Sequence, residues 1–418
     1  MREARQEGSM VETVVPSFRY RWVILGICWL AYIVVFMERL SIPPLAPFLK
    51  EDLTLTSAQV GFFMSAAAGG YAVMLIPAGW LVDRIGVRWM LLMGEVIGGI
   101  FIMGMFTVTS FAGGIIFMAL AGFGMGCLMP STTKAVIEWF PAKERATAMG
   151  FKQTAVNVGG MITASTLPTI ALTLGWRWGF VMYGVVGIII GIVSFMRYRE
   201  PPQSVALNTS EPTIPSGPRP SVREVLTSRE IPLLIGTGFC MIVVEFSGLT
   251  HFVLYLKEGL LFPVVTAGFL LAFVEGGGVF GKPISGLISD RLFHGGRKKV
   301  YMLWTGVTFA MCLIFTFLRQ ESPLWLIIPT CLIFGFVGIG WGGLQLTLVG
   351  EFAGKERAGT ITGISSALLL IGNIAGPPSL GYLIDITGSY QIAWQVLAIL
   401  ALLATVLLLF VREERRRI

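Results

Sequence analysis

Gly79-Trp80-Leu81-Val82-Asp83-Arg84 closes an apolar stretch in the first half of the chain, and Gly286-Leu287-Ile288-Ser289-Asp290-Arg291 closes another in the second half. Two further related segments, Lys143-Glu144-Arg145-Ala146 and Lys355-Glu356-Arg357-Ala358, each open an apolar stretch. An internal repeat of about half the chain, carried by apolar segments, is typical of transporters built from two similar halves. The repeat therefore predicts two related bundles of membrane helices.

The composition also predicts a membrane protein. Of the 418 residues, 55% are hydrophobic and only 13% are charged, whereas a soluble domain has about a quarter charged residues. So few charges cannot cover a chain of this length in water, and we expect most of its surface to face lipid. The two histidines and five cysteines form no ligand cluster, so neither a metal nor another cofactor is expected.

Twelve apolar runs are long enough to cross a bilayer, which needs about 20 residues per helix. They are continuous rather than alternating, which argues against a β-barrel. The predicted fold class is an all-α membrane protein with twelve transmembrane helices in two six-helix bundles related by pseudo-two-fold symmetry. The runs are Trp22–Phe48, Ala58–Leu81, Trp89–Val108, Phe111–Ile137, Ala148–Leu172, Trp178–Phe195, Ile231–Tyr255, Val264–Ile288, Val300–Phe317, Leu324–Val349, Ile361–Ile384 and Ala393–Val411.

Proline and polar residues interrupt the pattern between the two sets of runs. The predicted bundles are residues 1–197 and 230–418, with a linker at 198–229 that ends in a short helix at Ser221–Thr227. Lys and Arg concentrate at both termini and in the loops after the second, fourth and eighth runs. This asymmetry predicts that both termini and the linker lie on the cytoplasmic side of the membrane. The predicted location is a bacterial inner (plasma) membrane. It also explains the net charge of +7, so no nucleic acid is expected.

The segment from Gly79 to Arg88 reads G-W-L-V-D-R-I-G-V-R and resembles the signature loop of the major facilitator superfamily, G-x-L-x-D-R-x-G-x-R. The resemblance covers nearly all of the chain. It implies two bundles that rock about a central site, with a gating role for the signature loop, because a carboxylate at a helix end can pair with basic groups of a neighbouring helix. The gating residues implied by the two repeats are Asp83, Arg84, Arg88, Asp290, Arg291, Glu144, Arg145, Glu356 and Arg357.

A narrower resemblance lies in the first run. The segment from Phe36 to Pro47 reads F-M-E-R-L-S-I-P-P-L-A-P and is similar to the anion:cation symporter family, which has an acidic residue followed by Arg and then L-S-x-x-x-P. Members mostly move organic anions such as sugar acids, carboxylates and sulfonates, commonly with protons. The segment from Pro130 to Pro141 fits as well, but Met125 stands where many relatives have a carboxylate. No coupling role can be assigned at that position.

Ionisable residues inside a membrane span are costly and mark a transport pathway by default. Arg39 is the predicted anion ligand, since a guanidinium binds a carboxylate or sulfonate through a two-point fork. The alternatives are that Arg39 and Lys134 snorkel toward the lipid headgroups. The predicted substrate-binding residues are Arg39, Lys134, Lys152, Gln153, Asn157, Trp341, Gln345 and Asn373.

A proton symporter also needs an acid that can be neutral at physiological pH, and removal from water favours the neutral carboxyl. Glu38 is the first candidate, because it adjoins Arg39, followed by Glu275 and Glu245. For Glu38 the alternatives are an ion pair or a charge on the outer face. Glu95 is read as a structural partner of a neighbouring helix.

The sequence therefore predicts a secondary active transporter of a small organic anion, by proton-coupled symport with alternating access. An anion exchanger, a proton-coupled drug or cation exporter of the same fold, and a sensor or channel remain alternatives. We expect no enzyme, since no nucleophile–base pair appears, and no ATP-driven pump, since no G-x-x-x-x-G-K-[ST] loop is present. The expected partners are the anion, protons and membrane lipids, with the chain acting as a monomer.

Overall fold

The computed structural model describes residues 15–200, 221–293, 296–354 and 357–412. Within these ranges, twelve helical segments are long and apolar enough to cross a membrane, and the chain forms no strand. A continuous helix pairs each backbone N–H and C=O within its own segment, which a bilayer core requires because it offers no water. The predicted fold class is confirmed.

The first half holds six spans, two of which are broken into two helices. Its elements are α1 (Val15–Arg39), α2 (Ile42–Asp52), α3 (Ser57–Ile85), α4 (Val87–Gly104), η2 (Met105–Thr107), α5 (Phe111–Met125), α6 (Leu128–Trp139), α7 (Ala142–Thr173) and α8 (Trp176–Arg197).

The second half repeats this plan after α10 (Val222–Leu226), a short helix that confirms the one predicted at the end of the linker. Its spans are α11 (Glu230–Leu254) with the π-turn η4 (Tyr255–Gly259), α12 (Val264–Arg291), α13 (Arg297–Phe317), α14 (Leu324–Gly338) with α15 (Gly342–Ala353), α16 (Ala358–Thr387) and α17 (Tyr390–Phe410).

The interruptions of the spans follow the internal repeat. The first span breaks between Arg39 and Ile42, and the seventh, at the corresponding place in the second half, ends in η4. The fourth span breaks between α5 and α6, and the tenth breaks between α14 and α15. Pro43 and Pro44 stand in the first turn of α2, where a helix needs no N–H donor. The repeat therefore extends from the loops to the geometry of the spans.

The turn between α3 and α4 shows why the signature loop needs its second glycine. Gly86 has a φ of 85°, a value that residues with a Cβ rarely adopt. This turn reverses the chain within one residue, so that Arg88 already lies in the first turn of α4. Thr56 begins α3 with a capping box that includes Gln59.

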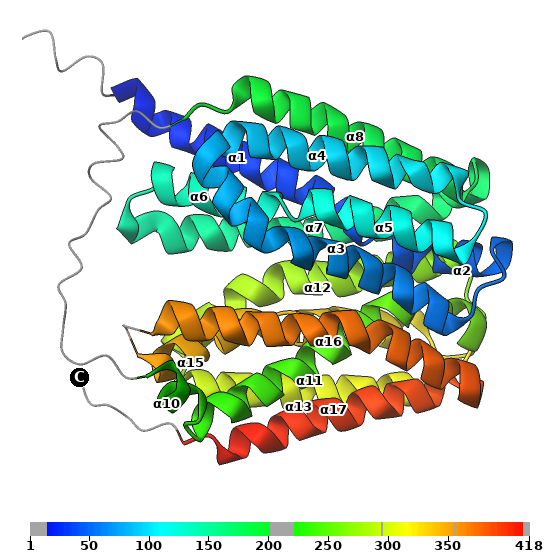
Figure 1. Cartoon of the computed structure of the whole chain (residues 1–418). Helices are drawn as coiled ribbons and strands as arrows, with labels where there is room; N and C mark the ends of the chain where they lie inside the picture. Colours follow the sequence, from blue (N-terminus) through cyan, green and yellow to red (C-terminus); the bar gives the residue numbers. More distant parts are fainter. Residues whose placement is uncertain (1–14, 201–220, 294–295, 355–356, 413–418) are drawn as a thin grey trace, which may run out of the picture.

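The two halves lie side by side, with the first half above the second in Figure 1. They meet where α3 packs on α16 and α7 packs on α12. At Gly61 of α3 an added Cβ would lie 2.5 Å from the backbone of Pro377 in α16, so glycine is needed there for the close approach. Gly268 of α12 likewise lies against the backbone of Ala164 in α7.

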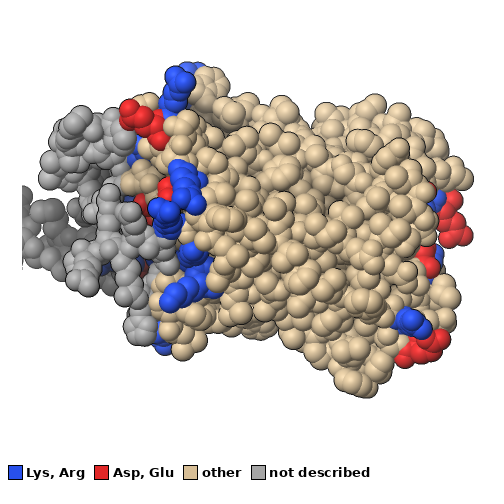
Figure 2. Space-filling model, turned by 90° about the horizontal axis from the view of Figure 1, so that it is seen from below, with Lys and Arg blue, Asp and Glu red and all other residues tan. Residues whose placement is uncertain are grey.

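On the face shown in Figure 2, charged residues gather at the two ends of the molecule, and a broad band between them carries almost none. Large apolar side chains, such as Ile76 and Trp325, are highly exposed, as expected for a surface that faces lipid. We call the end where α1 begins and α8 and α17 finish the terminal end. The opposite end, where α2 finishes and α3 begins, is the far end (Figure 1).

Candidate functional site

Arg39 lies between the two halves, where the first span breaks. It is the last residue of α1, and its side chain is only 4% exposed. Its guanidinium lies 4.9 Å from the ring centroid of Tyr71 in α3 and 5.7 Å from that of Phe246 in α11. Because α11 belongs to the second half, aromatic rings of both bundles surround this cation.

The guanidinium of Arg39 retains hydrogen-bonding capacity that the described part of the protein does not use. Its Nε and Nη2 atoms are buried and have no hydrogen-bond partner there. These two nitrogens form one edge of the group, whose N–H bonds can both reach the two oxygens of one carboxylate or sulfonate. A buried donor without a partner costs about 1–3 kcal/mol. The arrangement therefore has the chemistry of an anion-binding site.

A hydrogen bond joins the halves beside this position. Asn157 Nδ2 of α7 donates to Glu275 Oε2 of α12 at 2.7 Å, and both side chains are buried. Glycines make the contact possible, since an added Cβ at Gly160 would lie 2.5 Å from the carboxyl carbon of Glu275. An added Cβ at Gly278 would lie 2.7 Å from Nδ2 of Asn157. The pairing of α7 with α12 is thus shaped around this polar contact.

Glu245 of α11 extends the polar group into the second half. Its Oε2 accepts a hydrogen bond of 3.0 Å from Trp341 Nε1, and the carboxyl interacts electrostatically with Lys282, Glu275 and Arg39. We call Arg39, Asn157, Glu245, Glu275 and Trp341 the central cluster. Sequence reasoning had named all five residues, and the structure brings them together.

Lys152 is a second buried cation on the side of the first half. Its Nζ lies 4.7 Å from the ring centroid of Tyr32 and donates to Thr132 and Thr133 at 3.2 Å. Tyr32 in turn interacts with Tyr71 and with Arg39. Lys152 therefore adds positive charge behind the aromatic rings that hold Arg39.

Among the other predicted substrate-binding residues, Lys134 and Gln345 bind partners outside the central cluster. Lys134 Nζ binds Asp83 Oδ1 at 2.8 Å near the terminal end of the first half. Gln345 Nε2 donates to the carbonyl of Leu234 at 2.8 Å inside the second half. Gln153 is exposed on α7, and Asn373 is buried in α16.

Glu38 adjoins Arg39 in sequence but faces another way. Its carboxylate lies inside the first half beside Gly98 of α4 and Gly187 of α8, close to Glu95. Successive side chains of a helix point about 100° apart, so the neighbours on α1 face different helices. The expectation that Glu38 shares a site with Arg39 is therefore wrong in its geometry.

At the terminal end, the predicted gating residues of the first half are engaged within that half. Asp83 binds Lys134, and the Arg84 guanidinium lies 3.7 Å from the ring centroid of Trp80. The other contacts run from Arg88 Nε to the Phe195 carbonyl at 2.6 Å, from Arg21 to Glu144 at 3.0 Å and from Arg145 Nε to the Phe140 carbonyl at 3.0 Å.

The second copy is similar. Arg297 at the start of α13 pairs with Asp290 at 3.9 Å and also with Glu351 of α15. Arg291 is exposed, and Arg357 directly precedes α16. Glu356 lies outside the described residues.

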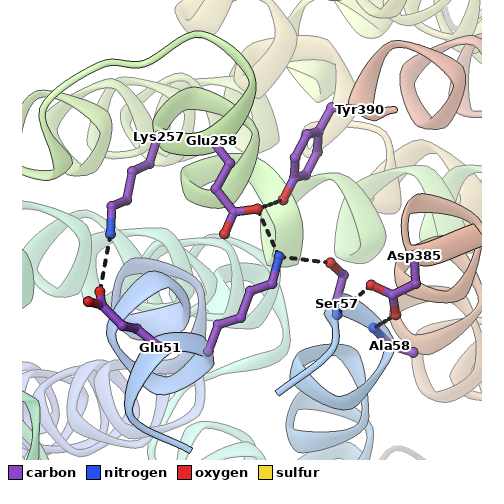
Figure 3. Close-up of polar contacts among 8 residues, drawn as sticks. Glu51, Ser57, Ala58, Lys257, Glu258, Asp385 and Tyr390 are labelled. Atoms are coloured by element: carbon purple, nitrogen blue, oxygen red, sulfur yellow. Dashed lines mark hydrogen bonds and ion pairs between the residues drawn. The ribbon is translucent and has the colours of Figure 1, made fainter. Parts of the chain in front are cut away.

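Sequence reasoning missed the polar contacts that join the two halves at the far end (Figure 3). Lys50 Nζ of α2 binds Glu258 Oε2 of η4 at 2.8 Å, and the hydroxyl of Tyr390 donates to the same oxygen at 2.6 Å. Lys257 of η4 pairs with Glu51 of α2 at 3.9 Å.

Asp385 of α16 makes a third bridge at this end. Its two carboxylate oxygens accept the backbone N–H groups of Ser57 and Ala58 at 2.8 and 2.9 Å (Figure 3). These N–H groups open α3 and have no partner within their own helix. The far end is thus closed by contacts between the halves.

The internal repeat could have revealed part of this network. Lys50-Glu51 finishes the first span and Lys257-Glu258 finishes the seventh, so the two dipeptides occupy corresponding places. Each lysine pairs with the glutamate of the other copy. The repeated Lys-Glu dipeptide is therefore a signal of this network that the sequence contains.

The Major Facilitator Superfamily model matches residues 28–377. A probable sulfoacetate transporter of Cupriavidus necator is 26% identical over 90% of each chain. A probable galactarate/D-glucarate transporter of Bacillus subtilis is 25% identical over 89% of this chain and 87% of its own. A hexuronate transporter of the same organism is 25% identical over 92% and 93%.

Solved structures share the fold. A bacterial homologue of the human lysosomal transporter Spinster, in an inward-facing and occupied conformation, superposes with a TM-score of 0.77 at 18% identity, covering 94% of this chain and 97% of its own. A D-xylose–proton symporter superposes with a TM-score of 0.76 at 14% identity, over 94% and 98%. Both compare over nearly the whole length of both halves.

Proposed function

This chain belongs to the Major Facilitator Superfamily, and we propose that it is a secondary active transporter of a small organic anion that binds at the central cluster. It is an integral membrane protein and not an enzyme. The observation that carries the proposal is Arg39, a buried guanidinium between the halves with two nitrogens free to bind an anion.

The chemistry of the relatives' substrates supports an organic anion. Sulfoacetate, glucarate and hexuronates are named for the relatives, and each carries a carboxylate or sulfonate on a small polar frame. The edge of Arg39 fits such a group. Asn157 Oδ1, which is buried and has no hydrogen-bond partner among the described residues, can accept from a hydroxyl of the polar remainder. Lys152 adds attraction for negative charge from behind the aromatic rings.

The distribution of charge supports an orientation. Lys and Arg gather at the terminal end (Figure 2), and loops rich in these residues stay in the cytoplasm. We place that end in the cytoplasm and the far end outside, in a bacterial inner (plasma) membrane. Because contacts between the halves close the far end, we take the described arrangement to be the state that opens to the cytoplasm. Transport then requires the far-end contacts to break while the terminal end closes.

Proton coupling is the remaining part of the proposal. Glu275 and Glu245 lie in the central cluster, where protonation changes the charge near the anion directly. Glu38 lies one helix face away and acts through α1. Replacement of the coupling glutamate by glutamine mimics its protonated form. The variant should exchange the anion across vesicles but should not accumulate it in response to a pH gradient.

The first experiment asks whether the chain binds an organic anion through Arg39. Purified protein is screened by thermal shift against sulfoacetate, D-glucarate, D-galactarate and D-glucuronate, and binding is then measured by calorimetry. Arg39→Lys keeps the charge but loses the fork, so we expect binding to fall at least tenfold. Arg177→Lys is the control, because Arg177 pairs with Asp52 at the far end. Unchanged affinity in Arg39→Lys, or no stabilisation by any of these anions, contradicts the proposal.

A further inference from the structure

Two buried carboxyl groups meet inside the first half, away from the central cluster. Glu38 of α1 and Glu95 of α4 are both completely buried. All four of their carboxylate oxygens are inaccessible, and within the described residues none has a hydrogen-bond partner. A lone buried carboxylate is costly, so two without partners require an explanation.

Glycines of α4 and α8 leave the space in which these groups approach each other. A Cβ added at Gly187 would lie 2.5 Å from Glu38 Oε1 and 3.5 Å from Glu95 Oε2. A Cβ at Gly98 would lie 3.1 Å from Glu38 Oε2, and one at Gly191 would lie 2.8 Å from the Cβ of Glu95. The two carboxyl groups therefore converge on the same point of α8.

No cation of the surrounding helices is described as pairing with these carboxyl groups. Arg39 faces Tyr71 and Phe246, and Lys152 faces Tyr32. The other ionisable groups on the packed helices are also engaged elsewhere: Lys134 with Asp83 and Glu138, Glu144 with Arg21, Arg145 with the Phe140 carbonyl, Arg88 with the Phe195 carbonyl, Arg177 with Asp52, and Tyr183 with Thr166. Lys143, Arg84 and Arg197 lie among the exposed residues near the ends of their helices.

Two carboxylates that meet in an apolar interior without a cation cannot both be ionised, because like charges repel and neither is hydrated. A proton held between them removes the repulsion and supplies a hydrogen-bond donor. We propose that Glu38 and Glu95 form one shared proton-binding site inside the first half, separated from the anion site by α1. The assignment of this site to proton coupling rests on the proposed function, but proton sharing by the pair does not.

The position of the pair lets its protonation state influence the anion site through the end of α1. Glu38 and Arg39 form the last turn of α1, directly before the break at Leu40 and Ser41. The hydroxyl of Ser41 donates to the Glu38 carbonyl at 2.7 Å and fixes this turn. A change of charge at Glu38 therefore acts on the turn that presents Arg39. Glu95 is a positioning residue in this scheme, since it acts through Glu38.

The test follows the protonated carboxyl groups of the full-length chain by infrared difference spectroscopy during a pH titration without any anion. With Glu95→Gln, the remaining Glu38 has no like charge beside it and should release its proton at a lower pH, by about one unit or more. Glu38→Gln should shift the titration of Glu95 in the same direction by a similar amount, because coupling is reciprocal. Glu51→Gln is the control, because the side chain of Glu51 is 82% exposed at the far end, and it should leave this component unchanged.

Glu95→Asp keeps an acid at the site and should restore most of the wild-type titration, which a purely structural role would not predict. If Glu95→Gln fails to fold, Glu95→Asp and Glu38→Gln still test the pair. A Glu38 titration that is the same in Glu95→Gln as in the wild type overturns the proposal. Vesicle assays with sulfoacetate and D-glucarate separate proton sharing by the pair from proton-coupled transport. If the two titrations are coupled but a pH gradient drives no accumulation of either anion, the shared site stands and proton symport is contradicted.

Discussion

The far end and the terminal end use the same kinds of side chain for different purposes. At the far end Lys50 binds Glu258, and Asp385 binds the start of α3, so each contact joins one half to the other. At the terminal end the ion pairs that the structure describes, such as that of Asp83 with Lys134, join residues of the same half. Ion pairs that cross between the halves thus mark the closed end.

The glycines along the interface helices make the same distinction. In α3, Gly61 near the far end touches the backbone of Pro377, whereas Gly79 near the terminal end has no atom within 4 Å of its Cβ position. In α12, Gly268 touches Ala164 and Gly286 has open space. Each of the two pairs, α3 with α16 and α12 with α7, is thus close-packed near the far end and not near the terminal end. Each of the following predictions tests that difference.

The largest effect is expected from Asp385→Ala. The change removes two hydrogen bonds that hold α16 to α3. Asp385 is exposed to solvent, so each bond contributes about 1 kcal/mol, and the loss of both exceeds that of one exposed ion pair. A cysteine introduced at Ala164, which is buried between α7 and α12, reports opening through its reaction with a membrane-impermeant thiol reagent. We expect its labelling from the far side to rise tenfold or more.

The chain without an added cysteine provides the blank, because its five cysteines are all buried. The parent for every comparison of rates is the chain whose single change is Ala164→Cys. Asp385→Asn is the matched variant and should give an intermediate rate, since an amide oxygen can still accept one of the two bonds. Labelling of Asp385→Ala at the parent rate would show that this end is not held closed by the contact.

Lys50→Glu should have the next largest effect. It removes the pair with Glu258 and places two like charges at the same point. Both partners are partly exposed, so we expect a rise of several-fold in labelling at position 164 rather than tenfold. The double variant Lys50→Glu with Glu258→Lys restores opposite charges and should return the rate toward that of the parent. If the double variant labels as fast as the single one, the charge pairing is not the cause.

The sequence predicted the twelve spans and the linker helix, because long apolar runs and capping residues are local signals. It did not predict the far-end network, in which Lys50 and Glu258 are 208 residues apart. Nor did it predict the direction of Glu38, which depends on the helices that pack on each face of α1. Arg39, Glu245 and Glu275 could be singled out from the sequence because charge inside a span is informative on its own, and their role in binding stays a prediction.

Lys134 is a residue whose binding partner the sequence did not reveal. It was expected at the substrate site because it lies inside an apolar run, yet its Nζ reaches Asp83 and the Val82 carbonyl on a neighbouring helix. The partner of a charge near the end of a span depends on the loop packed beside it, and a single sequence does not specify that loop's position.

Asp83→Asn tests the terminal end. In the described state this carboxylate pairs with Lys134 of its own half, so its loss should leave far-end labelling of position 164 within about twofold of the parent. Transport in vesicles should slow several-fold while anion affinity is retained, because the signature loop acts in the state that closes the terminal end. Asp290→Asn should slow transport less, since the second copy keeps only part of the signature motif. A large loss of affinity in Asp83→Asn would contradict a gating role.

The smallest effect is expected from Lys257→Glu, although it mirrors Lys50→Glu in the repeat. The Lys257–Glu51 pair spans 3.9 Å, against 2.8 Å for Lys50–Glu258, and the side chain of Glu51 is 82% exposed. Exposed pairs of this kind contribute little because water and salt screen them. Labelling at position 164 should therefore change by less than about twofold, and raising the salt concentration should abolish even that. Equal effects from both lysine variants would show that symmetry, rather than burial and distance, determines how strongly each copy closes the far end.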